Sequence, residues 1–133
     1  MKWNPIVPEL SVSNYRESVD FFEKIVGFSV VFERENPSFA YLDLHGAQLM
    51  IEEDHDTAWL VASLEKPRGR GINLQIDVPD VNEVQKRLDE AGIVPFRAMS
   101  ETSYETPEGD SRQLELLVQD PDGYLIRLVS YFE

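Results

Sequence analysis

Cysteine is absent from the 133 residues, so the chain can form neither a disulfide nor a thiolate nucleophile or metal ligand. No apolar run approaches the ~18 residues that cross a membrane. Residues 1–5 also lack the apolar core of a signal peptide. These absences exclude disulfide-stapled and membrane-spanning proteins, and they predict a cytoplasmic protein with no membrane partner.

Positive charge is scarce, with 12 Lys and Arg against 25 Asp and Glu and a net charge of -13. A nucleic-acid surface needs a basic face, so we expect no nucleic-acid partner. Acidic charge steers cationic ligands toward a protein, although an ordinary solvated surface explains most of these carboxylates. The 42% hydrophobic content and the length fit a single globular domain with a real core.

The first half of the chain reads as a β-α-β-β-β module. Residues 6–12 alternate as a strand, and Pro8 places this strand at a sheet edge because proline has no amide donor. Asn14 and Glu17 are typical of a helix start, and Gly27 of its end. Three short strands are predicted next, at residues 29–35, 39–44 and 47–52.

The same order of elements returns after a connection, at residues 53–70, in which apolar residues follow no clear period. A strand at 72–77 precedes a helix that Asp80 caps and Gly92 ends, and a strand at 94–98 and a loop at 99–111 follow. The connection should hold a short helical or extended piece around its tryptophan. The repeat indicates an internal duplication. The predicted organisation is one domain, 1–133, made of module one at 5–52, a connection at 53–70 and module two at 71–131.

A β-hairpin closes the chain at residues 112–130, with Asp-Pro-Asp-Gly at its turn. The period of two places Glu115 and Arg127 on the face opposite to that of Leu116. An arginine in the middle of a strand needs a partner. We predict a charge-assisted pair with the carboxylate of Glu52 or Glu115.

Tandem modules of this kind, Gly27-Phe28 after the first helix and Val-Gln-Asp-Pro-Asp-Gly-Tyr-Leu-Ile-Arg at 118–127 resemble the vicinal oxygen chelate superfamily. Glyoxalase I, extradiol dioxygenases and bleomycin resistance proteins belong to it. The resemblance covers essentially the whole chain. It implies an α+β fold of two tandem β-α-β-β-β modules that form a cupped mixed sheet with helices outside. It also implies a homodimer with cavities at or near the interface between modules.

In the superfamily's enzymes, four side chains hold a divalent metal. The resemblance places these positions at Val7, Glu52, Gly71 and Arg127. Only Glu52 is a ligand type, and a guanidinium repels a metal that needs three or four converging donors. His45 and His55 fall in a turn and a loop, so we interpret both as solvated surface histidines. We therefore predict no metal, no cofactor and no catalytic residue.

Strand alternation instead directs mostly polar side chains into the cup, and aromatic side chains supply walls. The predicted ligand-binding residues are Phe39, Tyr41, Met50, Glu52, Trp59, Gln75, Tyr104, Glu115 and Arg127. Trp59 and Tyr104 lie in irregular segments where no core stripe requires them, so each either stacks on a ligand or anchors its loop. The Arg127 pair either neutralises a half-buried strand or lines a ligand cavity.

These features favour a metal-free small-molecule-binding protein that resembles bleomycin resistance proteins. Such a protein would sequester a cationic or amphipathic aromatic ligand in a cavity of a homodimer, as in antibiotic resistance, and the apolar segment 59–61 would cover part of the partner chain. One alternative is a metal-dependent lyase, isomerase or dioxygenase. A third is a structural or regulatory homodimer whose cup is filled by its own side chains.

Overall fold

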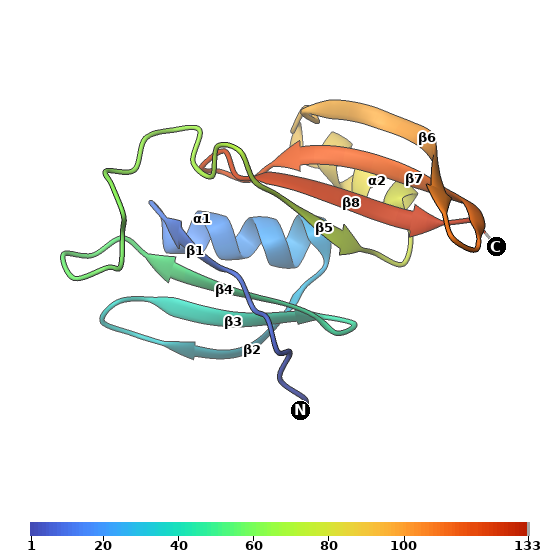
Figure 1. Ribbon diagram of the computed structural model, residues 1–133. Helices are drawn as coiled ribbons and strands as arrows, with labels where there is room; N and C mark the ends of the chain where they lie inside the picture. Colours follow the sequence, from blue (N-terminus) through green and yellow to red (C-terminus); the bar gives the residue numbers. More distant parts are fainter. Residues whose placement is uncertain (133) are drawn as a thin grey trace. The chain divides into compact units, whose positions relative to one another are not determined.

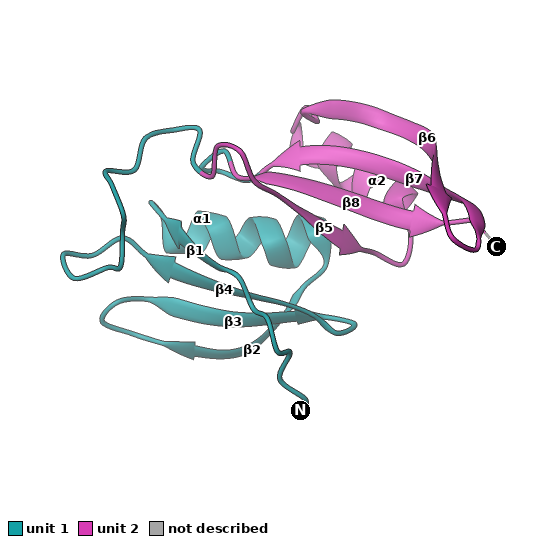
Figure 2. Ribbon diagram, viewed as in Figure 1, with its two compact units in different colours: residues 1–68, 120–123 teal, residues 69–119, 124–133 magenta. Residues whose placement is uncertain are grey.

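The computed structural model describes residues 1–132, which form two compact units (Figure 2). The first unit comprises Met1–Arg68 with Asp120–Gly123, and the second comprises residues 69–119 with the strand that follows Gly123. Each unit carries one four-stranded mixed sheet, so the predicted α+β fold of two tandem β-α-β-β-β modules is confirmed. No helix in the described part of the chain is both long and apolar enough to span a bilayer.

The sheet of the first unit has the strand order β1-β4-β3-β2 (Figure 1). Its elements are β1 (Glu9–Val12), α1 (Tyr15–Asp20), η1 (Phe21–Val26), β2 (Ser29–Arg34), β3 (Phe39–Leu44) and β4 (Ala47–Glu53). The first strand lies at the edge, as Pro8 predicts, and runs parallel to β4. It is shorter than the predicted 6–12, since Pro8 has no amide to donate and only its carbonyl bonds β4, at 2.9 Å from the amide of Met50.

The helix of the first unit begins and ends where the sequence predicts. The Asn14 side chain accepts from the Glu17 amide at 3.1 Å, and Gly27 takes the left-handed φ of 111° that stops the helix. From Phe21 onward the helix is a π-helix, a widening that the sequence did not indicate. The buried stripe consists of Tyr15, Val19, Phe22 and Val26.

The sheet of the second unit has the order β5-β8-β7-β6. Its elements are β5 (Asn73–Asp77), α2 (Val81–Ala91), β6 (Arg97–Thr106), β7 (Gly109–Gln119) and β8 (Leu125–Tyr131). Asp80 caps the helix through a 2.9 Å bond from the Asn82 amide, and Gly92 ends it, as predicted. The apolar face of the closing hairpin is fully buried at Leu116, Val118, Ile126 and Leu128.

Two predictions about irregular segments are wrong. Most of the expected loop at 99–111 is a hairpin, in which β6 pairs with β7 from Ser100 opposite Glu115 to Thr106 opposite Gly109. Most β6 side chains are exposed on both faces, so no apolar alternation marks the strand in the sequence. The helical version of the piece expected around Trp59 is also wrong, because no helix lies between β4 and β5.

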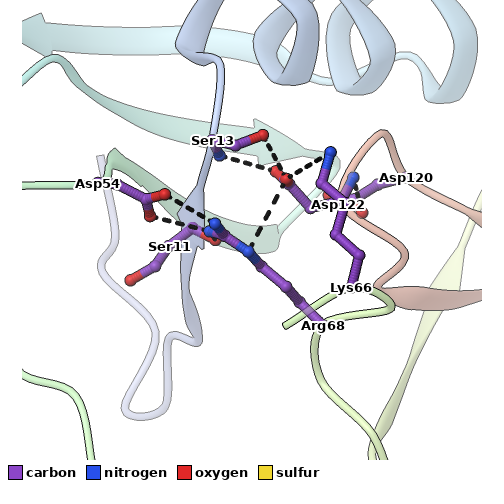
Figure 3. Close-up of polar contacts among 7 residues, drawn as sticks. All are labelled: Ser11, Ser13, Asp54, Lys66, Arg68, Asp120 and Asp122. Carbon is purple, nitrogen blue, oxygen red and sulfur yellow. Dashed lines mark hydrogen bonds and ion pairs between the residues drawn. The ribbon is translucent and has the colours of Figure 1, made fainter. Parts of the chain in front are cut away.

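A buried carboxylate joins three distant segments of the first unit (Figure 3). The Asp122 side chain has no exposed surface and accepts bonds from the amide and hydroxyl of Ser13, at 3.0 and 2.5 Å. Lys66 Nζ lies 3.6 Å and Arg68 Nε 3.9 Å from the same carboxylate. A buried charge must be matched by such partners. The end of β1, the connection and the turn at 120–123 are therefore held together.

Arg68 extends this cluster toward the loop that follows β4. Its guanidinium, 8% exposed, donates to both carboxylate oxygens of Asp54, at 2.8 and 2.7 Å, and to the Ser11 carbonyl at 3.0 Å. A bidentate pair of this kind is geometrically specific as well as strong. It fixes where the loop leaves the sheet, directly before His55.

The Asp122 cluster predicts a large loss of stability when its carboxylate is removed. Asp122→Ala should lower the free energy of unfolding by about 3–5 kcal/mol, because the Ser13 donors and Lys66 lose their shared carboxylate and the buried Arg68 loses one of its two. Urea unfolding followed by circular dichroism measures this. The matched control is Asp20→Ala, which removes exposed ion pairs to Arg16 and Lys24 and should cost about 1 kcal/mol or less. Equal losses in the two variants would contradict the role of Asp122.

Candidate functional site

The face of the first sheet opposite its helix carries a row of aromatic rings. Phe32 stacks on Tyr41 with centroids 5.3 Å apart, and Trp3 meets Tyr41 edge-on at 5.0 Å. The Arg34 guanidinium lies 4.1 Å from the centroid of Phe39, a cation–π contact. Strand alternation places Phe32, Arg34, Phe39 and Tyr41 on one face, away from the helix-facing core, and Trp3 packs there from before the first strand.

A cavity of about 320 Å³ adjoins this row. Strands β1, β2 and β4 supply its floor, and the loop after β4 supplies its rim. Its lining residues are Glu9, Ser11, Arg34, Glu52, His55, Thr57, Ala58 and Trp59. Carboxylates, one guanidinium, one imidazole and one indole thus converge on a space of the size that small ligands occupy.

His55 is part of this site, and the prediction that it is a solvated surface histidine is wrong. Its Nε2 lies 2.6 Å from Glu52 Oε1, and its Nδ1 lies 3.2 Å from the Thr57 hydroxyl. Both ring nitrogens are therefore engaged, and the ring is about three-quarters buried. The spacing Glu-x-x-His at the end of a strand was the available signal. His45 stays an exposed turn residue, as predicted.

The carboxylates of the cavity repel each other. Burial raises the pKa of Glu9 above its ordinary value, and the negative charge of Glu52 raises it further. Arg34 and His55 act on the pKa of Glu9 in the opposite direction without cancelling the rise. The electrostatic balance at Glu9 therefore favours an added positive charge.

Five of the predicted ligand-binding residues belong to the first unit, where four share the open face of the sheet: Phe39, Tyr41, Met50 and Glu52. The register pairs Phe39 with Glu52 and Tyr41 with Met50, so β3 and β4 present them side by side. Trp59 lines the cavity and is 98% exposed. An indole that anchored its loop would be buried, so that alternative for Trp59 is wrong.

The other four predicted residues lie in the second unit, on β5, β6, β7 and β8: Gln75, Tyr104, Glu115 and Arg127. The hydroxyl of Tyr104, which sits on a strand and not in the predicted loop, donates to the carboxylate of Glu115. No ion pair joins Glu115 to Arg127 within residues 1–132, so the predicted pair of Arg127 with Glu115 is wrong. The pair with Glu52 stays a prediction.

The residues at the resemblance-derived metal positions do not fit a divalent ion. Val7 and Gly71 have no side-chain donor, and Arg127 is a cation. The carboxylate of Glu52 is bonded to His55, and over residues 1–132 no group of three His, Asp or Glu side chains could hold a metal. Three or four converging donors are required, so no chemistry through a metal is derived for this site.

Comparisons with known proteins concern the whole chain. Residues 4–128 match the family model described as Glyoxalase/Bleomycin resistance protein/Dioxygenase superfamily. No curated protein sequence matches the chain. A virulence protein from Salmonella typhimurium is 21% identical with a TM-score of 0.67, over 99% of this chain and 100% of that one. The fosfomycin resistance protein FosX from Listeria monocytogenes is 17% identical with a TM-score of 0.64, over 99% and 94%. At these identities the likeness shows the fold alone.

Two substitutions should move the pKa of Glu9 in opposite directions. Glu52→Gln removes a negative neighbour and should lower this pKa toward 4.5, while burial keeps it above that value. Arg34→Met removes a positive neighbour and should raise it. NMR titration of the Glu9 side-chain carbonyl measures both.

The control for this titration is Glu65→Gln, an exposed carboxylate of the same unit that does not act on Glu9. It should leave the Glu9 titration unchanged. If Glu52→Gln also left it unchanged, the carboxylate coupling in the cavity would be refuted.

Proposed function

The chain belongs to the glyoxalase/bleomycin resistance protein/dioxygenase superfamily, and from that premise we propose that it binds and sequesters a small molecule without transforming it. The ligand would be a cationic or amphipathic aromatic molecule. One observation carries this proposal: the coupled carboxylates Glu9 and Glu52 line a cavity beside an aromatic row and an exposed indole.

The charge of the ligand is inferred from the carboxylates. The negative charge of Glu52 raises the pKa of Glu9, so a cation bound beside the two carboxylates relieves this repulsion. The guanidinium of Arg34 stacks on Phe39 and also lines the cavity, where it opposes the rise in the pKa of Glu9 without cancelling it. The net charge of -13 adds long-range steering of a cation toward the protein.

The aromatic character of the ligand is inferred from the rings. Trp59 stands at the rim with nearly its whole side chain in water, where it can close over a ligand at little cost to the fold. A cation against an indole face gains about 0.5–2 kcal/mol, depending on how far the contact is desolvated. Phe39 and Tyr41 lie on the same sheet face, where both rings are buried and support the surface beside the cavity.

The remaining parts of the proposal concern assembly and location. Leu60 and Val61 follow Trp59 and are exposed apolar side chains. A second copy of the chain would remove them from water, which supports the proposed homodimer. Cytoplasmic location and a role in antibiotic resistance also remain proposals. Fosfomycin resistance is a property of FosX itself.

The proposal predicts selective binding of phenyltrimethylammonium, which combines an aromatic ring with a fixed positive charge. Isothermal titration calorimetry at pH 7 should detect binding by the unaltered protein, and Trp59→Ala should weaken it about 2- to 30-fold through the lost cation–π contact. Glu52→Gln should weaken it as well. The affinity should fall as the pH drops through the raised pKa of Glu9, because protonation removes the charge that attracts the cation.

Benzyl alcohol serves as the uncharged aromatic control, and Val61→Ala is the control variant on the same exposed segment. Benzyl alcohol should bind more weakly than phenyltrimethylammonium. Val61→Ala should bind phenyltrimethylammonium as tightly as the unaltered protein does. Equal binding of the neutral compound, or unchanged affinity in both Trp59→Ala and Glu52→Gln, would contradict the proposed site.

The metal-dependent alternative predicts a different result. Elemental analysis of protein purified with added Ni²⁺, Zn²⁺, Fe²⁺ or Mn²⁺ should find no stoichiometric metal if the proposal is correct, since the donor set lacks the required ligands. A metal bound one per chain and lost in Glu52→Gln would instead support a lyase, isomerase or dioxygenase.

A further inference from the structure

The second sheet has an open face whose chemistry differs from that of the first. Arg127 lies on β8 and is the register partner of Gln75 on the parallel strand β5 and of Leu117 on the antiparallel strand β7. Tyr131 lies further along β8 on the same face. Arg127 is half-buried between its register partners Gln75 and Leu117.

Neutral donors satisfy the carboxylates near Arg127. The Tyr104 hydroxyl donates to Glu115, whose side chain is almost wholly buried and whose second oxygen lies 3.1 Å from the same hydroxyl. The Tyr131 hydroxyl donates to Asp77 at 3.2 Å. Each acid therefore has a hydroxyl partner, where an ion pair with the arginine would have been the stronger contact.

The guanidinium is left without an anion. Within the described residues of the second unit it forms no ion pair, and its Nε is buried with no hydrogen-bond partner. Its positive charge nevertheless reaches both hydroxyls. The pKa of Tyr104 is raised chiefly by the bond to Glu115 and that of Tyr131 chiefly by burial, and Arg127 opposes the rise in each. The guanidinium therefore acts on two phenolic groups, and it hydrogen-bonds the hydroxyl of Tyr104.

We propose that this face of the second unit is an oxyanion site in which Arg127 binds a small aromatic carboxylate. The planar fork of a guanidinium matches the two oxygens of a carboxylate. Leu117 and Leu125, both half-buried on the face of Arg127, offer apolar contact to a ring attached to that carboxylate. The site lies on the second unit, and its ligand has the opposite charge to the ligand proposed for the cavity of the first unit.

Calorimetric titration with benzoate at pH 7 tests the site, and inorganic phosphate serves as an anion without a ring. The unaltered protein should bind benzoate more tightly than phosphate. Arg127→Gln should weaken benzoate binding about tenfold or more, as the loss of a charge-assisted contact predicts. Arg127→Lys, which keeps the charge but not the fork, should give an intermediate affinity. Benzamide, which lacks the charge, should bind about tenfold more weakly than benzoate.

The matched control is Arg112→Gln on the same sheet, because Arg112 is exposed and already paired with Glu101. It should bind benzoate as the unaltered protein does. A second readout is the ultraviolet titration of tyrosine: loss of Arg127 should raise the pKa values of Tyr104 and Tyr131 further.

Failure of this site is distinguishable from failure of the cation site. Arg127→Gln should weaken the binding of benzoate but not that of phenyltrimethylammonium, because removing a positive charge does not weaken the attraction of a cation. The oxyanion site would be overturned if the unaltered protein bound neither benzoate nor phosphate, or if Arg127→Gln bound benzoate as tightly as Arg112→Gln. If Arg127→Gln does not fold, the comparison of Arg127→Lys with Arg112→Gln decides.

Discussion

The buried carboxylate of Asp122 is the constraint on which the organisation of the first unit depends. It draws Ser13, Lys66 and Arg68 around a charge that water does not reach, although Ser13 lies 109 residues away in the sequence. Such a charge is tolerated only when every partner stays in place. The turn at 120–123 thereby belongs to the first unit while its flanking strands belong to the second.

The same constraint positions the cavity. Arg68 contacts Asp122 and also binds Asp54, the residue before His55. The loop is therefore held at its start, where His55 bonds Glu52, while its tip at Trp59 stays in water. A rigid base with an exposed aromatic tip suits a site that must admit a ligand and then contact it.

The two units balance their charges differently. In the first, two acids face each other across a cavity that holds one guanidinium, and the pKa of Glu9 rises. In the second, tyrosine hydroxyls bond Glu115 and Asp77, and Arg127 forms no ion pair within the described part of that unit. A duplicated fold thus presents an acidic cavity in one unit and a cationic face in the other.

The secondary structure was largely predictable from the residues alone, because it depends on local periods and caps. Apolar alternation located most strands, and Asn14, Gly27, Asp80 and Gly92 marked the helix ends. The hairpin strand β6 was not predicted because most of its side chains are exposed on both faces, so the sequence has no hydrophobic period there. The π-helical segment was not predicted because no local residue pattern indicates it.

The sequence by itself determined the two modules, the face on which each strand residue lies and the polar character of those faces, since all of these follow from the period of the backbone. Only the tertiary structure decided which polar groups pair. His55 bonds Glu52, and Tyr104 takes the carboxylate that was assigned to Arg127. Hydrogen bonds act over about 3 Å, so the choice of partner depends on where side chains meet in space, which periodicity does not encode.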